Sequence, residues 1–173
     1  MKILLFSDSH RNVFNMKNVI ERFKNEISLI VHLGDYVSDF KEITKHIYEI
    51  PCISVKGNND FFEPNEQEEY IYNLNGINCL FTHGHRYGVK TGLNRLAEHA
   101  FQSKAKIVAF GHTHEPLVKQ IFDTLYINPG TIGGYSSGLP TFATVNVEKG
   151  NLVSAVVYEY NSTKNEIVVR ETI

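Results

Sequence analysis

The sequence predicts an α/β protein in which two β-sheets pack face to face with helices on the outside. Its first half alternates apolar strands with amphipathic helices, a pattern typical of parallel strands joined by right-handed crossovers. Its second half is rich in short strands and turns. The 173 residues, 42% of them hydrophobic, are enough to bury a sizeable core, and we expect one domain over residues 1–173.

The first half reads as a β-α-β-α-β unit. Apolar residues recur at helical spacing between Val13 and Ile27, which predicts an amphipathic helix after the first strand. Short apolar runs without polar interruptions predict strands that are buried on both faces. The expected elements are a strand over Lys2–Ser7, a helix that opens at Asn12 or Val13, a strand over Leu29–Leu33, a helix over about Phe40–Tyr48 and a strand over Cys52–Val55.

The second half opens with a predicted hairpin. Asn75-Gly76 tolerates the positive φ angles of a tight two-residue turn between strands over Glu69–Leu74 and Ile77–Thr82. The remaining elements are a helix around Leu93–Phe101, short strands over Ile107–Phe110, Leu117–Ile121 and Leu125–Ile127, and an antiparallel tail over Thr141–Val147, Leu152–Tyr160 and Ile167–Arg170, broken at Lys149–Asn151 and Asn161–Lys164. Glu63–Glu69 reads as a solvated acidic loop.

Composition narrows the classes of function. A net charge of −2 gives no global basic field, which argues against a nucleic-acid partner. The apolar run Ile3–Phe6 is too short for a signal peptide or a membrane span, so we expect a cytoplasmic protein without a membrane partner. The two cysteines, Cys52 and Cys79, lie in strand-like segments and read as reduced core residues.

Polar clusters follow five of the predicted strands. The clusters are Asp8-Ser9-His10, Gly34-Asp35, Gly57-Asn58-Asn59-Asp60, His83-Gly84-His85 and Gly111-His112-Thr113-His114. Strand ends of a parallel sheet bring distant residues into one crevice. In extended backbone, residues i and i+2 face the same way, so Asp8 and His10 could share one ion. Mixed Asp, Asn and His ligands suit Mn²⁺, Fe or Zn²⁺.

Each cluster has an ordinary structural interpretation as well. Asp8 could cap the first helix, Asp35 could be a turn residue, and Gly-Asn-Asn-Asp around Asn58 is strong turn composition. A lone histidine is more often structural, and His32, His46 and His99 are read that way. Five clusters in series, all at strand ends, favour a metal-dependent hydrolase.

The order of these clusters resembles the calcineurin-like metallophosphoesterase superfamily, whose pattern is D-x-H, G-D, G-N-H-D/E, H and G-H-x-H. The segment Thr82–Val89 and Asn128-Pro129-Gly130 resemble its small bacterial and archaeal phosphodiesterases. The resemblance implies a four-layer α/β/β/α sandwich of two mixed sheets flanked by helices. It also implies a phosphodiesterase with two divalent ions: manganese is expected, with nickel, zinc, iron or magnesium as alternatives.

Carried over by position, the resemblance implies two ligand sets. Asp8, His10, Asp35 and His114 would hold one ion, and Asp35, Asn58, His83 and His112 would hold the other, with Asp35 bridging. Two ions about 3.5–4 Å apart would clamp the phosphoryl oxygens and supply hydroxide at neutral pH. Asn59 and His85 are the expected catalytic contacts with the substrate, and Arg11 and Arg86 are further candidate substrate contacts.

One departure concerns the leaving group. The superfamily often has His where this chain has Asn59, and an amide cannot deliver a proton as an imidazolium can. This favours a small phosphodiester substrate with a good leaving group. The alternatives are a phosphomonoesterase, a nuclease, or a protein-interaction scaffold with weak activity, since the same fold serves in a coat complex. Phe61-Phe62 could form a homo-oligomer contact.

Overall fold

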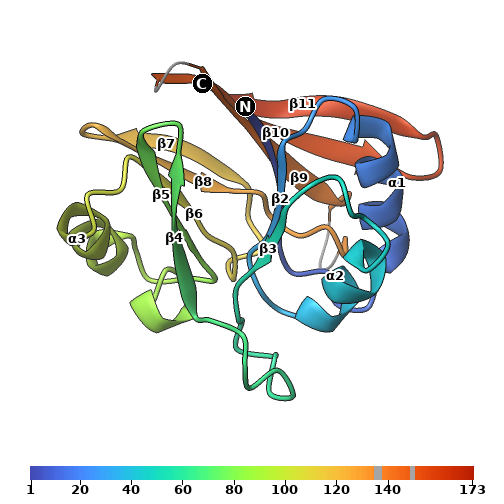
Figure 1. Cartoon of the computed structure of the whole chain (residues 1–173), viewed down its shortest axis with the longest axis horizontal. Helices are drawn as coiled ribbons and strands as arrows, with labels where there is room; N and C mark the ends of the chain where they lie inside the picture. The colour runs from blue at the N-terminus through green and yellow to red at the C-terminus, as the bar shows by residue number, and fades with distance from the viewer. Residues whose placement is uncertain (135–137, 149–150) are drawn as a thin grey trace.

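Two β-sheets face one another between helices, with α3 on one side and α1 and α2 on the other (Figure 1). The computed structural model describes residues 1–134, 138–148 and 151–173. The layers are those of an α/β/β/α sandwich, so the predicted fold class is confirmed. Lys149 and Gly150, where a break between the last strands was expected, lie outside the described residues.

The first sheet has six strands in the order β11-β10-β9-β1-β2-β3. Its first three strands in the chain are parallel, as the β-α-β-α-β pattern predicts. The tail strands add to it by antiparallel pairing, with β9 against β1. The bounds are β1 Lys2–Phe6, β2 Leu29–His32, β3 Cys52–Ser54, β9 Thr141–Glu148, β10 Asn151–Asn161 and β11 Glu166–Thr172.

The second sheet has five strands in the order β4-β5-β6-β8-β7. The predicted hairpin is confirmed in register from Glu69–Thr82 to Leu74–Ile77, and both turn residues have positive φ, +50° at Asn75 and +93° at Gly76. Strands β5, β6 and β8 are parallel. The bounds are β4 Glu69–Leu74, β5 Ile77–Thr82, β6 Ile107–Ala109, β7 Leu117–Ile121 and β8 Thr124–Asn128.

Three apolar clusters hold these layers together. Leu5, Val31 and Phe81 belong to the cluster between the two sheets. Leu4 and Phe6 point to the other face of β1 and pack in the cluster under α1 and α2. A strand buried on both faces reads as a continuous apolar run, which is why Ile3–Phe6 has no polar alternation. The third cluster lies under α3.

The helices are α1 Val13–Phe23, α2 Val37–Thr44 and α3 Asn94–Gln102, with a short 3-10 helix, η1, at His85–Tyr87. The predicted bounds of the second helix, Phe40–Tyr48, are wrong. The backbone N–H of Val37 donates to the Asp60 carboxylate at 2.8 Å, and this distant contact allows the helix to begin at Val37. Among the described residues, no helix has the length and apolar character needed to cross a membrane.

Candidate metal centre

The candidate residues meet at the carboxyl ends of β1, β2, β5 and β6 and in the turn after β3, where the two sheets adjoin. Several of them lie in the left-handed region, with φ of +55° at Asp8, +46° at His10 and +61° at Asp35. The expectation that Asp8 and His10 converge because they share one face of an extended strand is therefore wrong. They converge because the chain turns sharply as it leaves the sheet, a conformation that non-glycine residues adopt at some cost in strain.

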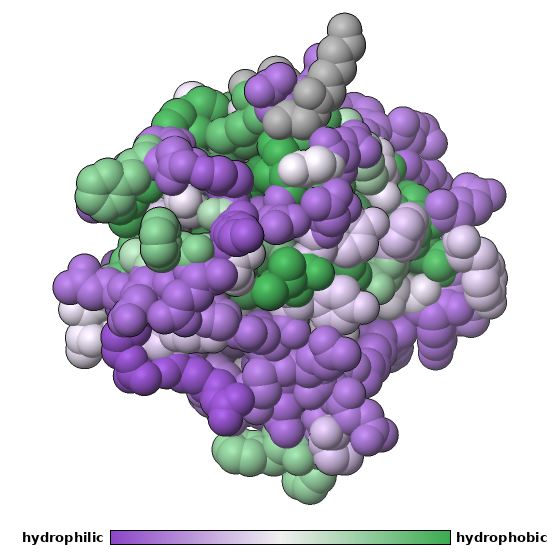
Figure 2. Space-filling model, turned by 60° about the vertical axis from the view of Figure 1, so that its left-hand side comes forward, coloured by the Kyte–Doolittle hydropathy of each residue, from purple (hydrophilic) through white to green (hydrophobic). Residues whose placement is uncertain are grey.

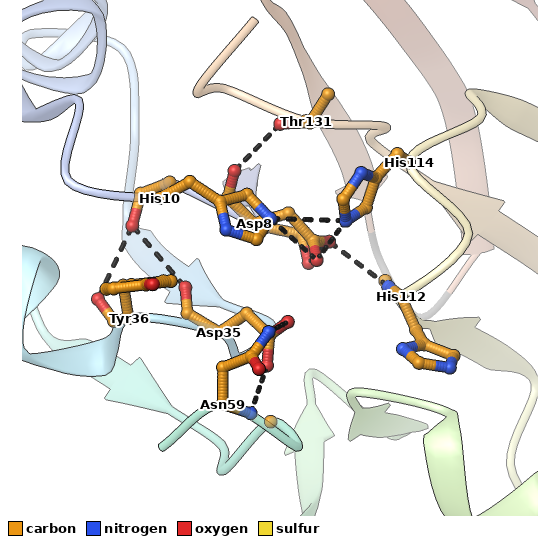
Figure 3. A network of polar contacts seen from close by, with 12 residues as sticks. Asp8, His10, Asp35, Tyr36, Asn59, His112, His114 and Thr131 are labelled. Atoms are coloured by element: carbon orange, nitrogen blue, oxygen red, sulfur yellow. Dashed lines mark hydrogen bonds and ion pairs between the residues drawn. The ribbon is translucent and has the colours of Figure 1, made fainter. Parts of the chain in front are cut away.

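Asp8, His10 and His114 form the first group of candidate ligands (Figure 3). Oδ1 of the buried Asp8 lies 3.0 Å from Nε2 of His114 and 3.9 Å from Nε2 of His10. The two Nε2 atoms are 3.2 Å apart. A suitable ligand atom from each residue lies within 4.8 Å of the others.

The arrangement of these ligand atoms suits a bound cation better than it suits hydrogen bonds among the three side chains. Among the described residues, Oδ1 of the buried Asp8 has no hydrogen bond donor in suitable geometry, although Nε2 of His114 lies 3.0 Å away. Two neutral imidazole nitrogens at 3.2 Å can share at most one proton. A buried carboxylate oxygen without a donor carries a desolvation cost. A divalent ion would satisfy the carboxylate and both ring nitrogens together.

The second group joins Asp35 and His83 to Asp8, again with ligand atoms within 4.8 Å of one another. Nδ1 of His83 lies 2.7 Å from the carbonyl oxygen of Leu33, which only accepts, so Nδ1 must donate. The lone pair of His83 is therefore on Nε2, which lies 3.5 Å from Oδ1 of Asp35 and 3.2 Å from Oδ1 of Asn58. A backbone acceptor that fixes the ring in this way is typical of histidine metal ligands.

His112 and His114 separate, although two residues apart. The backbone N–H of His112 donates to Oδ2 of Asp8 at 3.1 Å, while its ring is turned away from that carboxylate (Figure 3). The ring centroid lies 5.0 Å from that of His83 and 6.1 Å from that of His85. The cluster after β6 thus places the His114 ring in the first group and the His112 ring beside that of His83.

Burial and charge shift the ionisation of the group in opposite directions. Burial and the nearby His83 lower the pKa of His112 to about 4, and burial also lowers the pKa of His10. The Asp8 carboxylate raises the pKa of His114. Burial alone would raise the pKa of Asp8, but His114, His83 and the Ser7 hydroxyl outweigh it and lower that pKa. At neutral pH, His10 and His112 are therefore held uncharged, the form that binds metal.

The remaining predicted contacts lie around this centre. Asn59 is exposed and donates to Asp35 twice, from its backbone N–H at 2.8 Å and from its side-chain amide at 2.6 Å. The centroid of the His85 ring lies 5.4 Å from that of the His83 ring, and the two rings are tilted. The guanidinium of Arg11 lies 5.6 Å over the ring of Tyr36, and Arg86 is exposed beside Glu68 at 3.9 Å.

Two carboxylates that sequence reasoning left without a role hold the loops in place. Asp60 accepts the backbone N–H groups of Asp35, Val37 and Gly57 at 2.8–2.9 Å. Asp39 accepts the Ser9 hydroxyl and the Arg11 backbone N–H at 2.8 and 2.7 Å. The loops after β1, β2 and β3 are thereby tied to one another. Carboxylates near backbone N–H groups of distant loops leave no local pattern in the sequence.

The segment 128–133 supports the other loops. The Asn128 side chain donates to the carbonyl of Gly111 at 2.9 Å and accepts from the N–H of Gly130 at 2.8 Å. The Thr131 hydroxyl donates to the Asp8 carbonyl at 2.7 Å, a contact drawn in Figure 3. The Asn128-Pro129-Gly130 motif therefore fixes the loop that carries His112 and His114.

The acidic segment Glu63–Glu69 is not merely a solvated loop. Glu63 and Glu66 both contact Lys41, at 2.7 and 2.6 Å. Glu69 accepts from the Tyr87 hydroxyl at 2.5 Å, and His99 lies 3.1 Å from the same carboxylate. These contacts attach the segment Glu63–Glu69 to α2, η1 and α3. Its carboxylates therefore connect elements that lie on both sides of the candidate metal centre.

Comparison with known proteins decides the family. Residues 1–150 match the calcineurin-like phosphoesterase superfamily domain. The chain belongs to the calcineurin-like phosphoesterase superfamily. The predicted family and the predicted metallophosphoesterase enzyme are thereby confirmed.

Proteins similar to this chain cover most or all of its length. A phosphodiesterase of Methanocaldococcus jannaschii is 32% identical over 170 residues, spanning 86% of this chain and 95% of the relative. A solved archaeal phosphodiesterase is 26% identical with a TM-score of 0.67, covering 98% of this chain and all of the other. Vps29 of Chaetomium thermophilum has a TM-score of 0.79 at 16% identity, covering 100% of this chain and 95% of the other, and shows the fold alone.

Proposed function

We propose that this protein is a metal-dependent phosphodiesterase that hydrolyses a small phosphodiester at a dinuclear centre. The observation that carries the proposal is the pair of overlapping ligand groups, Asp8-His10-His114 and Asp8-Asp35-His83, each with ligand atoms within 4.8 Å. The 32% identical relative named a phosphodiesterase supports the substrate class. Two free cysteines, Cys52 and Cys79, agree with the reducing cytoplasm as the proposed location.

The residues that would hold the ions are those of the superfamily pattern. Asp8, His10, Asp35 and His114 would hold one, and Asp35, Asn58, His83 and His112 the other. Asp8 takes part in both groups of close ligand atoms, so it also lies where a bridging carboxylate would be placed. When bound, divalent ions at such a centre neutralise phosphoryl charge and make water a nucleophile at neutral pH, and manganese suits this mixture of ligands.

The chain's own side chains would orient the substrate. Asn59 holds the Asp35 carboxylate through both of its oxygens, leaving each oxygen a further lone pair for a cation. His85 lies beside His83 and His112, where its ring could donate to a phosphoryl oxygen. Arg11 and Arg86 are exposed on two sides of the centre, and their guanidinium groups could bind the remaining oxygens.

The test is metal analysis together with a substrate panel. Purified protein is loaded with Mn²⁺, dialysed, and analysed for bound metal per chain. The same sample is assayed with bis(p-nitrophenyl) phosphate, p-nitrophenyl phosphate, cyclic nucleotides and alkyl phosphates. We expect close to two ions per chain and the highest kcat/KM on a diester. Fewer than one ion per chain, or a preference for alkyl monoesters, would contradict the proposal.

A protein-binding scaffold is the second candidate function. Apolar surface favours it: Phe101 and Phe122 are 86% and 96% exposed around a groove of about 720 Å³ between α3 and the β7–β8 turn. Phe61 and Phe62 are 76% and 96% exposed in the loop between β3 and β4, which extends below both sheets in Figure 1. Figure 2 shows a largely polar face with an apolar group at its foot. The full set of candidate ligands favours the enzyme. A homo-oligomer through either surface is compatible with both functions.

A further inference from the structure

A pocket of about 400 Å³ opens beside His114, at the edge of the candidate metal centre. It is lined by the loop that carries His114, by the beginning of β9 and by the neighbouring strands β10 and β11. Its volume lies in the range of small-molecule sites. Because one of its walls is a candidate metal ligand, the pocket adjoins the place where a phosphodiester would bind.

The near part of the pocket has little free hydrogen-bonding capacity. The Thr113 hydroxyl accepts from Asn128 at 3.0 Å and from the Glu115 N–H at 3.2 Å, and the Thr131 hydroxyl donates to the Asp8 carbonyl. Pro116 and Leu139 add apolar surface, with Leu139 43% exposed. This part can contact the carbon face of a substrate arm but offers few polar partners.

The far part of the pocket is polar. Glu159 lies opposite Thr141 in the β10–β9 pairing, so both side chains are on the same face of the sheet. Nη1 of Arg170 donates to Oε1 of Glu159 at 2.5 Å. This single contact leaves the other guanidinium N–H groups and the second carboxylate oxygen able to bind a ligand. The ion pair therefore offers donors and an acceptor side by side.

The charges of the pocket disfavour a second anion. Two carboxylates, Glu115 and Glu159, stand against one guanidinium, that of Arg170, since His114 would be neutral as a metal ligand. An arm with its own phosphate would meet net negative charge, whereas vicinal hydroxyl groups can accept from Arg170 and donate to Glu159. The apolar near wall and polar far wall match a sugar, which has a carbon face and a hydroxylated edge.

We propose that this pocket binds the uncharged, hydroxylated ester arm of the substrate, and that Arg170 and Glu159 determine this specificity. The inference rests on the proposed phosphodiesterase function and narrows its substrate class to diesters in which one arm is a sugar or a similar polyol. Arg170 and Glu159 bind that arm and take no part in bond cleavage.

The experiment compares three substrates with the same leaving group: methyl p-nitrophenyl phosphate, glycerol p-nitrophenyl phosphate and uridine 5′-(p-nitrophenyl phosphate). We expect a KM about tenfold lower for the uridine ester than for the methyl ester, the effect of one or two hydrogen bonds to charged groups. The glycerol ester distinguishes the hydroxyl groups from the base and sugar ring. If the glycerol ester lowers KM by the same factor, the hydroxyl groups alone account for the recognition.

The variants Arg170→Gln and Glu159→Gln should remove most of that tenfold difference by raising KM for the hydroxylated esters. Values for the methyl ester should stay within about twofold. Arg22→Gln is the matched control, because Arg22 is an exposed arginine that donates to the Asn165 carbonyl away from this pocket. Arg22→Gln should leave KM unchanged for all three substrates.

A binding measurement separates this inference from the proposed function. Saturation-transfer NMR with uridine and metal-free protein should show contact with the ribose protons, weakened in Arg170→Gln and retained in Arg22→Gln. If none of the esters is hydrolysed, the phosphodiesterase proposal fails while this signal still reports on the pocket. Equal KM values for all three esters, a uridine signal unchanged in Arg170→Gln, or an equal loss on every substrate would overturn the inference.

Discussion

The amide of Asn59 holds the carboxylate of Asp35 at both ends, with its backbone N–H 2.8 Å from Oδ1 and its side-chain nitrogen 2.6 Å from Oδ2. The superfamily pattern often has a histidine at this position. In this chain the position is occupied by Asn59, which cannot deliver a proton as an imidazolium can. Asn59 instead fixes the orientation of Asp35, a candidate bridging ligand. That substitution shapes the expected substrate range.

Asn59→His should narrow the gap between good and poor leaving groups. The unmodified protein should hydrolyse bis(p-nitrophenyl) phosphate measurably and alkyl monoesters poorly, because general acid catalysis is typically worth about 10²–10⁴-fold. The histidine variant should gain at least about tenfold on the alkyl monoester relative to the diester. Asn59→Ala, which loses the amide without gaining a donor, is the control. A fall of both activities by the same factor in both variants at full metal content would refute this role.

Substitution of the candidate ligands should change metal content in a position-dependent way. Asp35→Ala should lose both ions, because the superfamily pattern assigns Asp35 to both, while His114→Ala should mainly lose one. Asp8→Ala tests whether Asp8, which shares both groups of ligand atoms, is the more important bridge. Elemental analysis after Mn²⁺ loading measures each, with His46→Ala, a histidine in an exposed turn, as the control. Full metal content in Asp35→Ala would remove the bridging assignment.

Gly57→Ala should damage the centre without replacing a candidate ligand. A Cβ at Gly57 would lie 2.2 Å from Oδ1 and 2.3 Å from the backbone N of Asp35, so Asp35 must move. We expect a loss of about 1–3 kcal/mol in unfolding free energy, typical of overpacking, together with loss of bound metal. In Gly76→Ala, where φ is +93° and no atom lies within 4 Å, strain of about 1–2 kcal/mol should leave metal binding intact. Urea unfolding and metal analysis of both variants test these two expectations.

His32 should make the metal-free protein less stable in acid. Burial lowers its pKa to about 4 in the folded state, against about 6.5 in an unfolded chain. Between these values the unfolded chain binds a proton that the folded chain rejects, so stability falls as the pH drops from about 6.5 to about 4. The contribution of His32 should reach about 2 kcal/mol between pH 7 and pH 5.

His32→Gln keeps a hydrogen bond acceptor for the Gly34 N–H, which Nδ1 of His32 accepts at 3.3 Å, but cannot titrate. Urea unfolding in the presence of a chelator should show a flatter pH dependence for this variant by about that amount. His46→Gln should retain the slope of the unmodified protein. An unchanged slope in His32→Gln would mean that His32 is protonated in the folded state or that its effect is negligible.

Local patterns were enough for most of the fold. The strand pairs on both sides of Asn75-Gly76 follow from alternation and from the positive φ that this turn requires. The parallel start follows from apolar strands that alternate with helices, and the order of Asp8, Asp35, Asn58, His83 and His114 at strand ends indicated the metal centre. These features depend on neighbours in the sequence, so the sequence displays them directly.

Tertiary structure alone decided how the side chains are used. The start of α2 at Val37 and the position of Asp35 both depend on Asp60, which is far along the chain and reaches them only through folding. Asp8 and His10 converge by left-handed turns that no periodicity predicts, and His112 and His114 separate for the same reason. The pocket between His114 and Arg170 joins two sheets, so its charge and shape exist only after the strands have packed.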